Sequence, residues 1–63
     1  MDKFSIVIKK NGRTNIRHYI SIEKADKLWH SALKGGAEEI WVGDISDADH
    51  PITLCQHPMI RDL

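Results

Sequence analysis

The chain has 63 residues, of which nine are Lys or Arg and nine are Asp or Glu, so its formal net charge at pH 7 is zero. This length predicts one domain with a small core, because a chain of about 60 residues buries only about 60% of the surface that it exposes when unfolded. The charge balance excludes a polybasic or an acidic tail protein. Cys55 is the single cysteine, which excludes an internal disulfide and favours a reducing, cytoplasmic location. No stretch approaches the roughly 20 apolar residues of a membrane span, so no membrane partner is expected.

Residues 3 to 9 alternate between inward and outward side chains, which predicts a half-buried strand. The inward face of this strand carries Phe4, Ile6 and Ile8, and the outward face carries Lys3, Ser5, Val7 and Lys9. The dipeptide at positions 11 and 12 is Asn-Gly, a strong signal for a hairpin. The hairpin leads into a second predicted strand over residues 14 to 20.

The hairpin loop decides which residues of the second strand face the core. A two-residue loop of Asn11 and Gly12 would leave Ile16 on the face away from Ile6 and would divide the apolar residues between two faces. A three-residue loop with Gly12 in a bulge sets Ile6 opposite Ile16. We therefore expect the bulged loop. In that register the inward residues of the second strand are Ile16, His18 and Ile20, and the outward ones are Asn15, Arg17 and Tyr19.

Residues 21 to 36 show the clearest helical period in the chain. At about 100° per residue, the apolar side chains fall within one arc. They are Ile22, Ala25, Leu28, Trp29, Ala32 and Leu33. Ser21 is the expected N-cap, and Gly35 with Gly36 forms the expected C-terminal cap. Asp26 and His30 are four residues apart and should form a surface pair.

Two further strands are predicted after the helix. Residues 38 to 44 alternate, with Ile40 and Val42 facing inward and Trp41 facing outward. Residues 52 to 56 form the fourth strand, which is expected at an edge because prolines at positions 51 and 58 bracket it. Its inward residues are Ile52 and Leu54. The pattern predicts no element in residues 57–63, a candidate flexible tail.

The order of these elements predicts a single α+β domain over residues 1–63 with the arrangement ββαββ. A right-handed return through the helix places the third strand beside the first, so we expect a four-stranded antiparallel sheet in the order 2-1-3-4. One helix covers one face of such a sheet. The open face would expose Val7, Tyr19 and Trp41 among basic side chains, and exposed aromatic residues of this kind point to a partner.

We expect a small, homodimeric, non-enzymatic protein-protein interaction module that meets its partner through the open face. The candidate partner-binding residues are Val7, Arg17, Tyr19 and Trp41. The size and layout resemble those of small accessory proteins of bacteria and their phages, and no family motif is present.

Two other functions are kept as alternatives. The first is single-stranded nucleic-acid binding, in which the aromatic side chains stack on bases and basic side chains hold phosphates. Its candidate contacts are Lys3, Lys9 and Arg17. The second is an inhibitor that docks the acidic half of the chain on a basic partner surface, because residues 35–63 carry six acidic residues and one basic residue. Its candidate residues are Glu38, Glu39, Asp44 and Asp47.

Neither a metal site nor a catalytic site can be identified in the sequence. The spacing of His50, Cys55 and His57 matches no structural zinc pattern. The acidic residues between positions 44 and 49 lack the glycine and the final glutamate of a calcium loop. A nucleophile and base dyad of Cys55 and His57 would also need an orienting group and an oxyanion site, and neither can be identified in the sequence. We therefore expect no metal, no cofactor and no catalysis.

Overall fold

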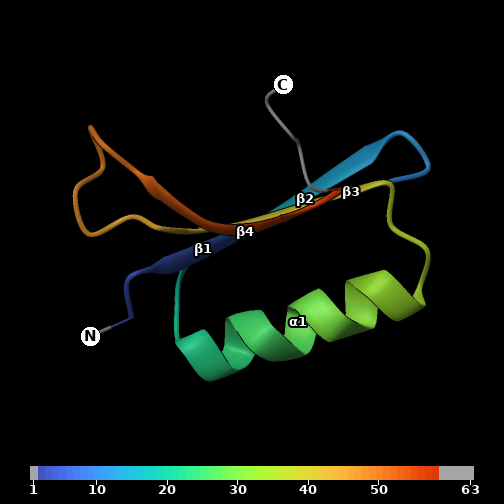
Figure 1. Cartoon of the computed structure of the whole chain (residues 1–63), viewed down its shortest axis with the longest axis horizontal. Helices are drawn as coiled ribbons and strands as arrows, with labels where there is room; N and C mark the ends of the chain where they lie inside the picture. The colour runs from blue at the N-terminus through green and yellow to red at the C-terminus, as the bar shows by residue number, and fades with distance from the viewer. Residues whose placement is uncertain (1, 59–63) are drawn as a thin grey trace.

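The computed structural model describes residues 2–58 as a four-stranded antiparallel sheet with one helix across one face (Figure 1). The elements are β1 (Phe4–Lys10), β2 (Arg13–Ile20), α1 (Ile22–Lys34), β3 (Glu39–Asp44) and β4 (Ile52–His57). The strand order is β2-β1-β3-β4, which confirms the predicted ββαββ arrangement. His57 is the last residue of β4, and residues 59–63 of the candidate tail lie outside the described residues.

Both ends of α1 form as their sequence predicts. The Ser21 hydroxyl accepts a hydrogen bond from the Lys24 N–H at 3.1 Å, so it satisfies one of the free donors of the first turn. At the other end Gly36 has a φ of 77°, in the left-handed region that favours glycine. The N–H of Ala37 then reaches the Ala32 carbonyl at 3.0 Å, the bond of a Schellman cap. The helix is therefore bounded by local interactions.

The hairpin between β1 and β2 has the two-residue loop, and the predicted bulged loop is wrong. Asn11 and Gly12 have φ values of 53° and 75°, the two positive angles of a type I′ turn. Ile6 therefore lies opposite Arg17, and Val7 lies opposite Ile16. The turn prevails because its backbone twist matches that of the strands it joins. Consequently Asn15 and Arg17 lie on the helix side of the sheet and Ile16 on the open side, the reverse of the prediction.

A bulge later in β2 returns its last residue to the core. The pairing shifts between Ile6 and Phe4, so that Phe4 lies opposite Ile20. Tyr19 absorbs the shift with a φ of 56°, an angle that a non-glycine residue seldom adopts. His18 precedes the shift and lies on the open side with Ile16. The predictions are therefore right for Ile20 and wrong for Ile16 and His18.

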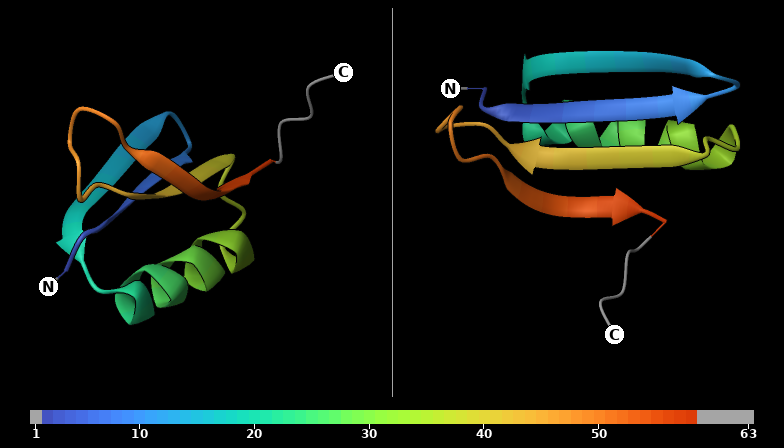
Figure 2. Two further views of the ribbon diagram at one scale, coloured as in Figure 1. Left: turned by 60° about the vertical axis from the view of Figure 1, so that its left-hand side comes forward. Right: turned by 90° about the horizontal axis from the view of Figure 1, so that it is seen from above.

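The core lies between α1 and the two central strands. Its buried apolar residues are Ile6, Ala25, Ala37, Ile40 and Val42. Side chains packed against them are Phe4, Ile8, Ile20, Leu28, Trp29 and Ala32. The core lies there because α1 runs beneath β1 and β3, as the right-hand view of Figure 2 shows. The predicted inward residues of β4 gain less cover, because Ile52 is 61% and Leu54 48% exposed.

Candidate functional site

We call the side of the sheet opposite α1 the outer face. One row of cross-strand neighbours crosses it from edge to edge, and its members are Ile16, Val7, Trp41 and Gln56. The first three are apolar and come from three adjacent strands. Ile16 is 53% exposed, whereas Val7 and Trp41 are half-buried. We refer to these three residues as the apolar row.

The Trp41 side chain is held in one place on the outer face. Its indole Nε1 donates a hydrogen bond to Thr53 Oγ1 at 2.8 Å. The far edge of the ring lies against Gly43, where an added Cβ would overlap Cη2 and Cζ2 of Trp41. Gly43 therefore allows the ring to lie on the sheet, and the bond to β4 fixes its orientation. An interface residue that is already ordered loses little conformational entropy on binding.

A buried hydroxyl on the outer face is paired with a histidine. Ser5 has no exposed surface, and its Oγ lies 2.8 Å from Nδ1 of His18. The hydroxyl is thus satisfied, as buried polar groups generally are. Because Ser5 is enclosed, its oxygen has no access to a substrate and the pair does not form a nucleophile and its base. Its role is to connect β1 to the bulged end of β2.

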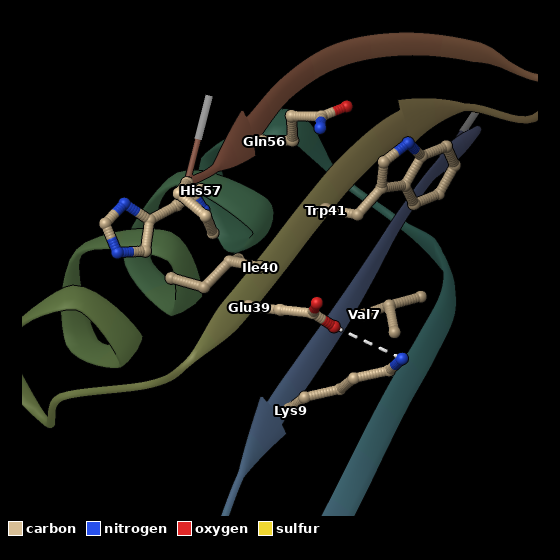
Figure 3. A pocket seen from close by; sticks show the side chains of 8 residues that line it. Val7, Lys9, Glu39, Ile40, Trp41, Gln56 and His57 are labelled. Carbon is tan, nitrogen blue, oxygen red and sulfur yellow. Dashed lines mark ion pairs between the residues drawn. The ribbon is translucent and has the colours of Figure 1, made fainter. Parts of the chain in front are cut away.

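A shallow hollow lies beside the apolar row. It has a volume of about 370 Å³ and includes Val7 and Trp41 in its lining (Figure 3). Lys9 and Glu39 border it and form an ion pair, with Nζ and Oε2 3.2 Å apart. The hollow is open and apolar at its centre. It could accept an apolar side chain from another molecule.

The structure brings together only part of the predicted partner-binding set. Val7 and Trp41 are neighbours on adjacent strands, as expected. Arg17 lies across from Ile6, so its predicted place on the open face is wrong. Tyr19 is 66% exposed at the bulge of β2. Ile16 was missed, although the Asn-Gly preference for a type I′ turn carries the signal that would have placed it there.

The three candidate nucleic-acid contacts do not converge. Lys3 Nζ lies 3.2 Å from Asp44 Oδ2, and Lys9 is paired with Glu39 at the same distance. Arg17 is on the helix side of the sheet, as the register requires. A strand of phosphates would meet two lysines that already have carboxylate partners, and Arg17 lies on the opposite side of the sheet from Lys9. The geometry therefore provides no common phosphate track.

The four candidate acidic residues lie before β3, at its two ends and in the loop after it, and they have partners of their own. Glu38 accepts a hydrogen bond from the Asn11 N–H at 3.2 Å, and Glu39 is paired with Lys9. Residues 39 and 44 stand at opposite ends of the strand, about 16 Å apart at the usual rise per residue. The carboxylate of Asp47 accepts the Asp49 N–H at 3.1 Å. These carboxylates do not form one docking patch.

The Asp44 carboxylate at the end of β3 is surrounded by donors. The Ser46 hydroxyl and the Ser46 N–H both donate to its Oδ1, and Lys3 is close to its other oxygen. These donors hold the pKa of Asp44 below its ordinary value of 3.8, with the Ser46 hydroxyl the largest cause. The arrangement is an Asx turn that closes the start of the loop after β3.

A second groove lies between α1 and the β4 edge. It has a volume of about 510 Å³, and Ile22, Trp29 and Leu54 contribute apolar surface to it. Asp26 on its rim is paired with His30 at 3.3 Å, which confirms the predicted helix pair. The groove exists because α1 packs on β1 and β3 and leaves the helix side of β4 partly uncovered.

Cys55 lies in this groove and is not activated. Burial raises the pKa of its thiol, and the negative charge of Asp26 raises that pKa further. A raised pKa reduces the thiolate fraction, and the thiolate is the reactive form. His57 lies opposite Ile40 in the strand pairing. Within residues 2–58 no three side chains of the His, Cys, Asp and Glu types gather as metal ligands would.

None of the helical structure within residues 2–58 has the length and apolar content that a bilayer crossing requires. No family model, no curated protein and no solved structure matches the chain.

Proposed function

We propose that this protein is a non-enzymatic interaction module whose outer sheet face binds the surface of another protein. The observation that carries the proposal is the apolar row, in which Ile16, Val7 and Trp41 stand side by side on the face that α1 leaves open. A few anchor residues, among which Trp is enriched, supply most of the binding free energy in protein interfaces. Other residues around such anchors mainly exclude water.

The polar groups beside the apolar row support a protein partner. Trp41 Nε1 is bonded to Thr53, Ser5 is bonded to His18, and Lys9 is paired with Glu39. Polar groups that already have partners are easier to bury than groups that would lose water without replacement. A face with an apolar centre and internally paired polar neighbours is therefore suited to a dry protein interface.

The same pairing argues against single-stranded nucleic acid as the ligand. Affinity for phosphates depends on free lysine and arginine side chains that release counterions on binding. Two of the three candidate cations of this chain are within 3.2 Å of carboxylates.

We place the interaction in the cytoplasm, a reducing compartment, on the evidence of the single free thiol of Cys55. A second copy of the chain is one protein that this face can bind.

Affinity capture from a nuclease-treated native lysate tests the proposal. Val7→Glu adds a charge at the middle of the apolar row and should abolish retention of the partner. Ser31→Glu adds the same charge on the exposed side of α1, away from the outer face, and should leave retention unchanged. Circular dichroism of each variant establishes that the fold is kept. If Val7→Glu unfolds the chain, Val7→Thr keeps the branched shape and should weaken retention.

Two results would contradict the proposal. The first is a folded Val7→Glu variant that retains every partner of the native chain. The second is retention of an oligonucleotide at low salt that falls steeply as salt is added, which would favour the nucleic-acid alternative.

A further inference from the structure

The two edges of the sheet differ in how well they are protected against pairing with another strand. β4 is a short edge of six residues, its pairing shifts between Val42 and Gly43, and prolines stand on either side of it. Short strands, bulges and prolines are the usual devices that block an edge. β2 has eight residues and contains no proline. Its pairing with β1 is regular from Arg13 to Arg17, so the middle of this edge is unprotected.

The hairpin geometry fixes which backbone groups of β2 are free. Lys10 and Arg13 flank the two-residue loop, and the pair that flanks such a loop exchanges both of its backbone hydrogen bonds. Hydrogen-bonded and non-hydrogen-bonded pairs then alternate along the ladder. Asn15 and Arg17 therefore point their N–H and C=O groups toward β1. The corresponding groups of Thr14 and Ile16 point away from the sheet, and His18 follows them in the alternation.

We propose that β2 pairs with β2 of a second copy, antiparallel, about a twofold axis at Ile16. The free N–H and C=O groups of Ile16 would bond to those of the partner's Ile16, and Thr14 would bond to the partner's His18. Each dimer would contain one continuous eight-stranded sheet. This inference goes beyond the proposed function, since it names the occupant of the β2 edge and leaves the outer face free for a further protein.

The charges of β2 favour this register over the two whose axes lie at Asn15 and Arg17. Moving the axis to Asn15 would place Arg13 opposite the partner's Arg17, and moving it to Arg17 would place that arginine opposite its own copy. Like charges directly opposite each other destabilise a strand pair. With the axis at Ile16, Arg17 faces the partner's Asn15, an amide that can accept its hydrogen bond. Arg13 then approaches the exposed Tyr19 of the partner, a favourable contact for a guanidinium.

The pairing would also cover an exposed apolar side chain of the edge, Ile16. Ile16 is 53% exposed in the single chain, and a twofold axis through its position sets it beside the partner's Ile16 on the same face. The apolar row of one copy would then continue into that of the other, from Trp41 of one protomer to the partner's Trp41. Both helices would lie on the opposite face. The dimer would thus present a continuous apolar strip twice as long as that of the monomer.

The first experiment removes the free N–H of Ile16 without disturbing the hairpin. Ile16→Pro lacks that N–H, which is not bonded to β1, and proline is tolerated at such edge positions. Ile16→Ala is the matched control, because it shortens the side chain and keeps the N–H. In sedimentation velocity over a concentration series, we expect the native chain to form dimers, Ile16→Ala to form them more weakly, and Ile16→Pro to remain monomeric. Circular dichroism of each variant verifies the fold.

The second experiment tests the register and decides the question if Ile16→Pro does not fold. In a Cys55→Ser background, Ile16→Cys should form a disulfide-linked dimer under mild oxidation, since hydrogen-bonded pairs have Cα atoms about 5.5 Å apart. Thr14→Cys is the control on the same face. It should not cross-link, because it would lie four residues from its own copy, about 13 Å along the strand.

Three results would overturn the inference. They are a native chain that stays monomeric at every concentration, an Ile16→Pro variant that still dimerises, and cross-linking of Thr14→Cys as fast as that of Ile16→Cys. Loss of the dimer in Val7→Glu together with its survival in Ile16→Pro would indicate packing between two outer faces. That result would reject the edge and support the outer face as an interface, so the two proposals fail separately.

Discussion

Trp41 and Gly43 act as a unit on the outer face, since the ring occupies the space that a side chain at Gly43 would need. Gly43→Ala should therefore lower the free energy of unfolding by about 1–3 kcal/mol, the usual cost of overpacking. Urea denaturation measures this cost. In a Trp41→Val background the same substitution should cost much less, because the ring is gone. Equal costs in the two backgrounds would show that the ring does not fill this space.

Asp44 makes the stability of the fold dependent on pH. Its pKa is lowered in the folded state, chiefly by the Ser46 hydroxyl, so its contribution is fully present above the ordinary value of 3.8 and is lost as the pH falls through the folded value. Ser46→Ala should lower the melting temperature at neutral pH, and the difference from the native chain should shrink on acidification below that range. Thermal unfolding at a series of pH values measures the difference. A difference that stays constant would contradict this role of Asp44.

At the scale of the elements, the hairpin turn determines which residues β2 presents to each side. Asn11 needs a positive φ in the observed type I′ turn, whereas in the predicted bulged loop only Gly12 would need one. Asn11→Ala should therefore lower the free energy of unfolding by about 1 kcal/mol, and Asn11→Gly should lower it by less. Chemical denaturation of both variants measures the two costs. If alanine were tolerated as well as glycine at position 11, the turn would not have this geometry.

The elements themselves follow from local sequence, whereas the outer face depends on how they are combined. Ser21 and Gly36 bound the helix through bonds within one turn, so their roles could be predicted. The placement of Ile16 could not be predicted, because two sequence signals disagree. Keeping all apolar residues on one face favours the bulged loop, whereas Asn-Gly favours the two-residue turn. The contacts of Trp41 with Thr53 join positions 12 residues apart, and local patterns contain no information about them.

At the scale of the whole molecule, α1 is too narrow for the sheet that it covers. It packs on β1 and β3 and leaves Ile52 and Leu54 of β4 exposed, while Ile16 of β2 is exposed on the outer face, which no helix covers. A domain of this size has a small hydrophobic core, so a partner that covers either edge would add substantially to its stability. The difference in protection between the two edges makes β2 the one that another strand can join.

Amide hydrogen exchange along β2 separates a free edge from a paired one. In dilute solution the N–H groups of Asn15 and Arg17, which bond to β1, should exchange slowly, and those of Thr14 and Ile16 should exchange as solvent-exposed amides do. If two copies pair through this edge, the second set becomes protected as the concentration rises, while the first set changes little. The alternation distinguishes strand pairing from packing between outer faces, which would leave edge amides open. Uniform protection along β2, independent of concentration, would contradict both the register and the dimer.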